Sequence, residues 1–283
     1  MNQLKVKQAL EHFFIEDIGD LDVTSDYLFD NREAEVEFQV KQSGVFCGGS
    51  VIVTGFQLID PSIQVHLLKE DGEKVSPGEV VAIVKGNQGS LLKGERVVLN
   101  LVQRMSGIAT LTALAVKNLH SEHTKICDTR KTTPGLRMFE KYAVRMGGGF
   151  NHRNGLYDAA MIKDNHIALA GSITKAVHHL RKRLGHMVKI EVETETEKQV
   201  REAVEAGVDC VMFDNRTVQE IQRFIQLIPP HIITEASGSV KVENLSKYSN
   251  CGVDYISLGC LTHSVASLDI SVNVNQLERG ILK

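Results

Sequence analysis

A strong charge of either sign is the first feature that the sequence lacks. Its 283 residues include 32 Lys and Arg against 35 Asp and Glu, which gives a formal net charge of -3 at pH 7. A protein that gathers nucleic acid or anionic lipid through its overall field needs a clear positive excess. We therefore expect neither a nucleic-acid partner nor a membrane partner.

The sequence also lacks an export signal and a long apolar run. Glu11, Glu16 and Asp17 fall where a secretory leader needs an unbroken apolar segment. The longest mostly apolar run, residues 44–56, is interrupted by glycines and is well short of the roughly 20 residues that span a bilayer. A cytoplasmic location is the expectation.

Cysteine is sparse and has no paired spacing. The chain has five cysteines, an odd number without a C-x-x-C motif, so the sequence predicts neither a disulfide framework nor a zinc site. We expect each of them to be a small buried apolar side chain. They are Cys47, Cys127, Cys210, Cys251 and Cys260.

Tryptophan is absent and aromatic residues make up only 5% of the chain, but 42% of the residues are hydrophobic and 24% are charged. This composition is typical of a globular protein with a sizeable core and excludes disordered and fibrous classes. The length allows one large domain or two ordinary ones. The P-loop, H-E-x-x-H and G-x-S-x-G motifs are all missing, so nothing supports the corresponding nucleotidases, zincins or hydrolases.

The first hundred residues have an α+β pattern. Residues 34–40 and 63–67 alternate apolar and polar side chains as half-buried strands do, and helical spacing covers 4–14 and 91–102. Residues 71–84 resemble the hairpin of a carrier domain that bears a lipoyl or biotinyl lysine, but no lysine stands at a hairpin tip. Two turns between strands explain the segment as well, and we favour that interpretation.

From Lys125 onward, short apolar runs alternate with helical patterns, and each run ends in polar or charged residues. Repeated strand-then-helix units predict a parallel sheet, because parallel strands need crossover helices. Polar residues that gather after each strand favour an α/β barrel, whose site lies at the C-terminal ends of its strands. A doubly wound open sheet is the structural alternative. The predicted strands are 125–127, 160–162, 188–192, 210–213, 232–234 and 255–258.

One predicted strand carries charge on a single face. In residues 189–193, Lys189, Glu191 and Glu193 alternate with two apolar residues. The apolar face must pack on the outer helices of a barrel, so the charged face points inward, where buried charges need partners. Lys163 and Lys189 are the predicted partners. An exposed acidic loop after the strand is the alternative.

Charge is also segregated along the chain. Residues 125–166 contain eight Lys and Arg against four Asp and Glu, whereas residues 191–214 contain eight acidic residues against two basic ones. If both segments line one barrel mouth, a cationic arc faces acidic side chains. That arrangement suits a substrate with several anionic groups together with a divalent cation.

A series of short motifs extends over nearly the whole chain, from Glu16–Asp20 to His263. In order, they are ERVVLNL at 95–101, RMSGIAT at 104–110, DTRKTTPGLR at 128–137, KYAV at 141–144, GGGFNHR at 147–153, IKDNH at 162–166, EVE at 191–193, DN at 214–215, EASG at 235–238 and GCLTHS at 259–264. Together they closely resemble the quinolinate phosphoribosyltransferase family, also called decarboxylating nicotinate-nucleotide pyrophosphorylase.

The resemblance implies a pentosyltransferase that uses Mg²⁺. Quinolinate and phosphoribosyl pyrophosphate would give nicotinate mononucleotide, pyrophosphate and carbon dioxide in NAD biosynthesis. It also implies an α/β fold, with an incomplete, open α/β barrel over 108–265 and an N-terminal α+β open-faced sandwich domain over 1–107 that the segment 266–283 joins. The expected assembly is a homodimer with shared active sites, alone or within a hexamer.

The resemblance assigns roles to residues by motif. The catalytic set would be Lys131, Glu193 and Asp214. Lys131 would lie beside the reacting centre and the pyrophosphate, while Glu193 and Asp214 would contact the ribose hydroxyls and Mg²⁺. Arg96 would reach the site across the dimer. The quinolinate carboxylates and nearby phosphate would be bound by Arg130, His152, Arg153 and Lys163, and the 5′-phosphate by Ser237, Gly238, Gly259 and His263.

Two positions depart from the family pattern. Arg216 stands where a hydrophobic residue is usual, and it either adds an anion contact or starts a helix on a solvated face. Ser239 replaces a second glycine but could still offer its backbone N–H to phosphate. Three other functions stay open: a sister phosphoribosyltransferase with another acceptor, a Schiff-base lyase that uses Lys163 or Lys189, and a catalytically silent anion-binding module.

Overall fold

The computed structural model describes residues 1–29 and 32–275. The chain divides into two compact units, each built from separate stretches. The N-terminal unit consists of Met1–Leu111, Pro134–Gly148 and the segment that begins at Val265, and the barrel unit consists of Thr112–Thr133 and Gly149–Ser264. Of the C-terminal segment expected at 266–283, residues 276–283 lie outside the described residues.

The framework of the N-terminal unit is an antiparallel sheet. Its strands are β1 (Glu33–Val40), β3 (Gln64–Leu67), β5 (Val80–Asn87) and β12 (Ile270–Asn275). They lie in the order β12-β1-β5-β3. A separate pair joins β2 (Gly44–Val45) to β4 (Lys74–Val75), so the segment that resembles a carrier hairpin contributes to two different sheets.

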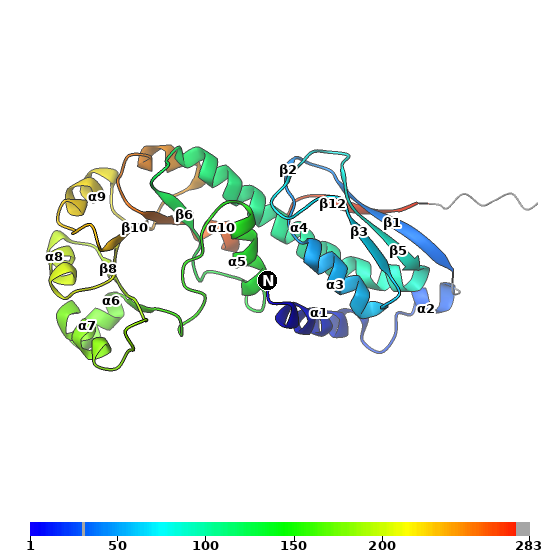
Figure 1. The fold of residues 1–283 in the computed structure, drawn as a ribbon, viewed down its shortest axis with the longest axis horizontal. Helices are drawn as coiled ribbons and strands as arrows, with labels where there is room; N and C mark the ends of the chain where they lie inside the picture. The colour runs from blue at the N-terminus through cyan, green and yellow to red at the C-terminus, as the bar shows by residue number, and fades with distance from the viewer. Residues whose placement is uncertain (30–31, 276–283) are drawn as a thin grey trace, which may run out of the picture. The chain divides into compact units, whose positions relative to one another are not determined.

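Helices cover one face of this sheet. The helices that belong to this unit are α1 (Gln3–Ile18), α2 (Ser25–Leu28), α3 (Gly49–Ile59), α4 (Gln88–Leu119) and α5 (Arg137–Met146). Alternate residues of β1 are buried, and Phe38 among them meets Phe56 of α3 edge to face, with ring centroids 6.0 Å apart. The intervening residues of β1 stay half-buried or exposed, which is the open-faced sandwich that the family resemblance implied (Figure 1).

Helix α4 is long and apolar enough to pass a length-and-composition test for a membrane span. Of its most apolar window, 61% is buried inside the protein, as in the core helix of a soluble fold. Glycines let this helix approach α3 closely. A Cβ at Gly94 would lie 2.9 Å from the Phe56 ring, and a Cβ at Gly55 would lie 2.5 Å from Val98.

The barrel unit contains a six-stranded parallel sheet in the order β6-β11-β10-β9-β8-β7. Among the described residues, no ladder joins β6 to β7, so the barrel is open there, as expected. The strands are β6 (Lys125–Cys127), β7 (Ala160–Ile162), β8 (Ile190–Thr194), β9 (Cys210–Asp214), β10 (Ile233–Ser237) and β11 (Tyr255–Ser257). The helices are α6 (Asp164–Ala170), α7 (Ile173–Arg181), α8 (Glu197–Glu205), α9 (Val218–Ile225), the 3₁₀ helix η1 (Val242–Tyr248) and α10 (Cys260–His263).

The alternation along the barrel strands separates core from site. Ile190 and Val192 of β8 are fully buried, and Phe213 of β9 packs on Phe224 of α9 with ring centroids 6.0 Å apart. The residues between them face the inside of the barrel. All five cysteines are free; four are buried and Cys260 is half-buried, so the prediction of no disulfides is confirmed.

Candidate active site

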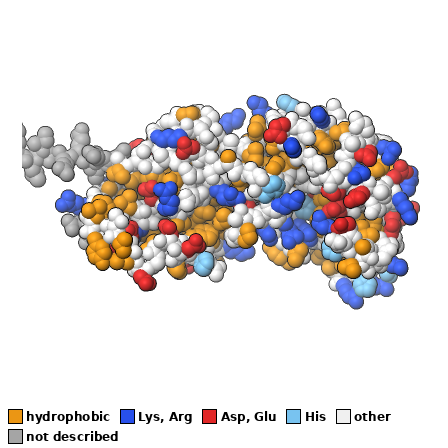
Figure 2. Space-filling view, turned by 180° about the vertical axis from the view of Figure 1, so that it is seen from behind, with side chains coloured by type: hydrophobic (Ala, Val, Ile, Leu, Met, Phe, Trp, Pro, Cys, Tyr) orange, Lys and Arg blue, Asp and Glu red, His pale blue; other side chains and the backbone are white. Residues whose placement is uncertain are grey.

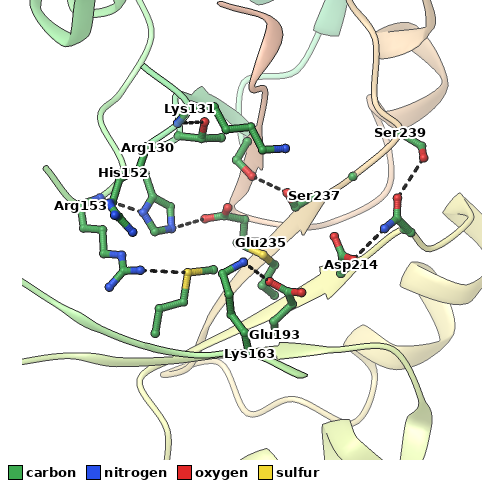
Figure 3. A pocket seen from close by; sticks show the side chains of 16 residues that line it. Arg130, Lys131, His152, Arg153, Lys163, Glu193, Asp214, Glu235, Ser237 and Ser239 are labelled. Carbon is green, nitrogen blue, oxygen red and sulfur yellow. Dashed lines mark hydrogen bonds and ion pairs between the residues drawn. The ribbon is translucent and has the colours of Figure 1, made fainter. Parts of the chain in front are cut away.

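A pocket of about 600 Å³ opens at the C-terminal ends of the barrel strands. Figure 3 shows basic side chains on one side of it and carboxylates on the other. Every strand of the sheet contributes to it directly or through the loop that follows. The lining residues are Thr129, Arg130, Lys131, His152, Arg153, Met161, Lys163, Glu193, Met212, Asp214, Asn215, Glu235, Ser237, Gly238, Ser239 and Ser257.

Two arginines form the cationic side. Nε of Arg130 is buried and has no hydrogen-bond partner in the described part of the chain. Arg153 donates to the carbonyl oxygen of Ala159 at 3.0 Å, which holds its guanidinium at the pocket wall. Burial and the neighbouring charge of Arg130 lower the pKa of Arg153. Two guanidiniums that repel each other and keep an unused donor are well suited to a ligand with more than one anionic group.

A buried carboxylate anchors the loop that carries Arg153. Asp128, which is fully buried at the end of β6, accepts hydrogen bonds from Nδ2 of Asn151 at 2.6 Å and from the backbone N–H of His152 at 2.9 Å. The next turn is closed by Asp158, which accepts from the backbone N–H groups of residues 154 and 155. The loop is therefore fixed by its own carboxylates rather than by regular secondary structure.

The acidic side consists of Glu193 at the end of β8 and Asp214 at the end of β9. Glu193 pairs with Lys163, whose Nζ lies 2.5 Å from its Oε2, so Lys163 is a cationic partner of the inward face, as predicted. Asp214 accepts from Nδ2 of Asn215 at 2.7 Å. A lysine whose Nζ is engaged by a carboxylate is poorly placed to act as a Schiff-base nucleophile. The other lysine of that alternative, Lys189, is exposed and does not line this pocket.

The end of β10 forms a tight turn at the pocket rim. Gly238 and Ser239 both have positive φ, 80° and 56°. A Cβ at Gly238 would lie 2.4 Å from Oδ1 of Asn215, so only glycine fits there. Ser239 donates to that same oxygen at 2.9 Å, and the hydroxyl of Ser257 donates to Ser237 at 2.9 Å. Small side chains and a sharp turn leave backbone groups accessible to a phosphate.

Three predicted residues lie outside the lining. Gly259 and His263 are neighbours of Lys131: a Cβ at Gly259 would lie 3.0 Å from the Lys131 side chain and 3.0 Å from the His263 ring. Thr262 donates to the Lys131 carbonyl oxygen at 2.8 Å. Arg96 lies on α4 in the N-terminal unit, where it is exposed.

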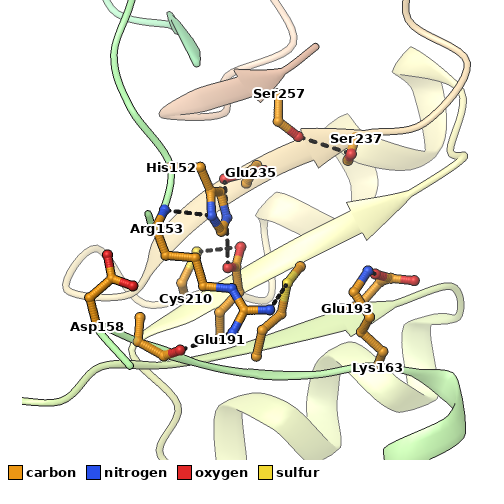
Figure 4. A network of polar contacts seen from close by, with 12 residues as sticks. His152, Arg153, Asp158, Lys163, Glu191, Glu193, Cys210, Glu235, Ser237 and Ser257 are labelled. Atoms are coloured by element: carbon orange, nitrogen blue, oxygen red, sulfur yellow. Dashed lines mark hydrogen bonds and ion pairs between the residues drawn. The ribbon is translucent and has the colours of Figure 1, made fainter. Parts of the chain in front are cut away.

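Beneath the pocket lies a buried cluster that sequence patterns did not resolve (Figure 4). Nε2 of His152 is 2.9 Å from Oε2 of Glu191 and 3.6 Å from Oε2 of Glu235. Glu191 does point inward and is 7% exposed, but its partner is His152 and not Lys189, because the loop after α5 delivers an imidazole from above. Nδ1 of His152 accepts the backbone N–H of Arg153 at 2.8 Å, which places the ring proton on Nε2.

Glu235 and Ser257 line the pocket although no role was predicted for either side chain. The alternation of side chains along a strand could have identified Glu235, because Glu235 shares the inward face of β10 with Ser237. Burial, followed by the nearby Glu191 carboxylate, raises the pKa of Glu235 to about 8. Its Oε1 is buried without a hydrogen-bond partner among the described residues.

Arg216 lies directly before Thr217, the N-cap of α9, which is closer to the second of the two expectations for this position. Its Nε donates to the Asp214 carbonyl oxygen at 2.9 Å, and its guanidinium lies 3.6 Å from Glu220 on α9. Most of the acidic side chains in residues 191–214 also lie on the surface. Glu197, for example, pairs with Arg201 on α8 at 2.8 Å. Over the outer helices α7, α8 and α9, acidic and basic side chains are interspersed (Figure 2).

The sequence matches two family models in order. Residues 22–106 match the N-terminal domain of quinolinate phosphoribosyl transferase, and residues 108–273 match its C-terminal domain. A Bacillus subtilis (strain 168) protein named "Probable nicotinate-nucleotide pyrophosphorylase [carboxylating]" is 56% identical over 274 residues, which cover 97% of this chain and 95% of that protein.

Solved structures agree over nearly the whole chain. The crystal structure of NadC from Streptococcus pyogenes is similar with a TM-score of 0.93 at 39% identity, covering 97% of this chain and 98% of that one. The structure of the nicotinate-nucleotide pyrophosphorylase from Francisella tularensis gives a TM-score of 0.92 at 35% identity, with 97% and 98% covered. Both domain matches, these structures and a pocket built from the shared motifs lead to one conclusion: the chain belongs to the quinolinate phosphoribosyltransferase family.

Proposed function

We propose that the protein transfers the phosphoribosyl group of phosphoribosyl pyrophosphate to quinolinate, with loss of carbon dioxide, to give nicotinate mononucleotide and pyrophosphate in NAD biosynthesis. One observation carries the proposal: a single pocket places Arg130, Lys131 and Arg153 opposite Glu193 and Asp214. Family membership supports the same reaction.

The cationic side suits the acceptor. Quinolinate carries two carboxylates on adjacent ring carbons, and Arg130 and Arg153 can each bind a carboxylate through paired N–H donors. The unused Nε of Arg130 is one such donor. A dicarboxylate relieves the repulsion between two guanidiniums better than a monocarboxylate does, so quinolinate should be preferred over nicotinate.

The acidic side suits the donor. Departure of pyrophosphate from the anomeric carbon builds positive charge on the ribose, which Glu193 and Asp214 stabilise while Lys131 stabilises the leaving group. The oxygen donors of Glu193 and Asp214 are of the kind that Mg²⁺ prefers, and they would hold the ion at the pocket. When bound, Mg²⁺ would neutralise charge on the pyrophosphate.

The turn at the end of β10 is the proposed 5′-phosphate site. Ser237 and Gly238 would supply a hydroxyl and a backbone N–H, and Gly259 with His263 would complete the site beside Lys131. Anion binding by such turns depends on close approach of the backbone, which the missing Cβ of Gly238 permits. We place His152 under the acceptor, with its ring nitrogens engaged by the protein.

The assembly is part of the proposal. Arg96 is an exposed cation in the N-terminal unit, and it would complete the site as Arg96 of the partner subunit in a homodimer, alone or within a hexamer. Five free cysteines are consistent with a reducing compartment, and we propose a cytoplasmic location.

The test is a turnover assay with quinolinate, phosphoribosyl pyrophosphate and Mg²⁺. We expect nicotinate mononucleotide and pyrophosphate in equal amounts, and a higher kcat/KM for quinolinate than for nicotinate. Absence of product at every Mg²⁺ concentration would exclude the proposal. Preference for another acceptor would instead identify a sister phosphoribosyltransferase.

A pair of variants tests the catalytic role of Glu193 on the acidic side of the pocket. Glu193→Gln removes the charge beside the ribose and breaks the ion pair with Lys163, so we expect kcat to fall by about 100-fold or more. Glu195→Gln changes an exposed carboxylate two residues away and should leave kcat unchanged. Equal activity of the two variants would contradict the role given to Glu193.

A further inference from the structure

The reaction proposed above requires a proton at a ring carbon. When the carboxyl group next to the ring nitrogen leaves as carbon dioxide, the C–C bond breaks and its electron pair stays on the ring carbon, where the cationic ring nitrogen stabilises it. A new C–H bond must then form at that carbon. Placing an acid within reach of such a site typically contributes about 10²- to 10⁴-fold in rate.

Most side chains at the acceptor end of the pocket are already committed. Arg130 and Arg153 carry guanidinium groups, which bind anions through hydrogen bonds. Lys163 is paired with Glu193 at 2.5 Å. His152 directs its Nε2 proton toward Glu191 at 2.9 Å and away from the pocket.

Glu235 differs from all of these. Its side chain rises from the inward face of β10 into the pocket floor, between the basic wall and the Lys163–Glu193 pair (Figure 3). Oε1 is buried without a hydrogen-bond partner among the described residues, and the nearby His152 and Ser257 favour the ionised form less strongly than burial opposes it. Oε2 lies 3.6 Å from Nε2 of His152.

The surroundings of Glu235 keep it protonated. Its side chain is only 5% exposed, and the Glu191 carboxylate shares the same cluster, so burial and like charge both oppose ionisation. The resulting pKa of about 8 leaves a neutral carboxylic acid at pH 7. A carboxyl group of this kind can give up a proton to a developing carbanion.

We propose that Glu235 is the catalytic acid that protonates the ring carbon after carbon dioxide leaves, an inference that rests on the proposed function. The O–H bond of Glu235 breaks as the C–H bond forms, and the electron pair left by decarboxylation becomes the C–H bond. Glu235 is left as a carboxylate. It regains a proton from water before the next turnover, so the overall reaction consumes one proton from solvent.

The decisive variant is Glu235→Gln. Because the resting side chain is neutral, glutamine keeps its charge and nearly its shape and removes only the acidic proton. In a single turnover with enzyme in excess and rapid quenching, pyrophosphate should appear at the wild-type rate. Nicotinate mononucleotide should form about 100-fold more slowly, and a mononucleotide that retains both carboxyl groups should accumulate, as detected by mass spectrometry.

Two results would overturn the proposal. One is equal formation of pyrophosphate and nicotinate mononucleotide by Glu235→Gln at the wild-type rate. The other is a loss of both products by the same factor, which would assign Glu235 a structural or binding role. Glu191→Gln is the matched control in the same cluster, and its first-turnover product should stay fully decarboxylated.

Wild-type protein provides a test that needs no variant. Between pH 6 and 9.5, the share of first-turnover product that retains both carboxyl groups should rise as Glu235 ionises near pH 8, and a constant share would contradict the proposal. If wild-type protein releases no pyrophosphate with quinolinate, the proposed function itself fails instead. The titratable groups that face Glu235 are Glu191 on β8, His152, Asp128 after β6, Cys210 on β9 and Tyr255 on β11.

Discussion

At the scale of single residues, the site depends on a position that has no side chain. Gly238 has φ of 80°, and a Cβ there would lie 2.4 Å from Oδ1 of Asn215 and 2.8 Å from Oδ1 of Asp214. Positive φ costs a residue with a Cβ about 1–2 kcal/mol, and the close contacts would in addition displace the carboxylate at the pocket rim. A substitution at Gly238 would therefore have two effects, a loss of stability through backbone strain and a loss of activity through the displaced carboxylate, and experiments can separate them.

We therefore predict that Gly238→Ala lowers both stability and activity, whereas Gly207→Ala lowers stability alone. Gly207 has φ of 71° and no heavy atom within 4 Å of an added Cβ, so it reports the strain without the displacement. Both variants should lose about 1–2 kcal/mol of unfolding free energy in urea. Only Gly238→Ala should lose more than about 10-fold in kcat/KM for phosphoribosyl pyrophosphate, which corresponds to about 1.4 kcal/mol of transition-state binding.

The sequence patterns predicted which strand faces point into the barrel better than they predicted which side chains pair with each other. The alternation in β8 correctly placed Glu191 and Glu193 inside the barrel, and Lys163, one of the two predicted cationic partners, pairs with Glu193. The other candidate, Lys189, is not a partner, and the residue that pairs with Glu191 was not predicted, because His152 lies on an irregular loop held by the buried carboxylate of Asp128. Periodicity carries no information about such a loop.

At the scale of elements, α4 approaches the C-terminal segment closely in the N-terminal unit. A Cβ at Gly107 would lie 2.2 Å from the carbonyl oxygen of Ala266. Backbone hydrogen bonding accompanies this approach, since Leu268 donates its N–H to the carbonyl oxygen of Gln103 at 2.9 Å. The helix thus holds the main chain that leads into β12.

Gly107→Ala should destabilise the protein although alanine favours helices. Glycine to alanine gains up to about 1 kcal/mol of helix propensity, but overpacking against a backbone that cannot move away costs about 1–3 kcal/mol or more. Gly94→Ala on the same helix is the control, because its added methyl would meet the Phe56 ring, which can shift. A thermal midpoint for Gly107→Ala at or above that of Gly94→Ala would contradict the packing described here.

Elements were predictable where apolar periodicity is strong. The barrel strands fall within three residues of their predicted bounds, the largest difference being the end of β10, whereas α6 buries no side chain and so carries too little apolar signal to be found by spacing alone. The cationic segment 125–166 was also less uniform than it looked. Its members Arg137, Lys141 and Arg145 belong to α5 in the N-terminal unit, so charge counted along the chain overstates the charge in the pocket.

At the scale of the whole molecule, Glu235 links the site to global stability. Its pKa rises from 4.5 to about 8 on folding, so between these values the native state holds a proton that the unfolded chain has released. The contribution of Glu235 to stability therefore falls as pH rises through this window and becomes constant above it. This loss of unfolding free energy accompanies the burial of a neutral carboxylic acid inside the barrel.

We predict that Glu235→Gln removes this pH dependence. The thermal midpoint of wild-type protein minus that of the variant should decrease steadily from pH 5.5 to 8.5, because only the wild type has to keep a proton on a buried carboxyl group. Thermal unfolding followed by circular dichroism at four or five pH values measures the difference directly. A difference that does not change with pH would show that Glu235 is ionised in the native state.

The pairing of β12 with β1 determines when each unit can be completed on the ribosome. Val40 pairs with Ile270 and Glu35 with Asn275, so β1 leaves the exit tunnel long before the strand that covers its edge has been translated. An uncovered strand edge is a template for association with other chains. The barrel unit, which is encoded later, needs no strand beyond β11 for its sheet. The N-terminal unit is therefore translated first but completed last. A chaperone that shields β1 would act during that interval.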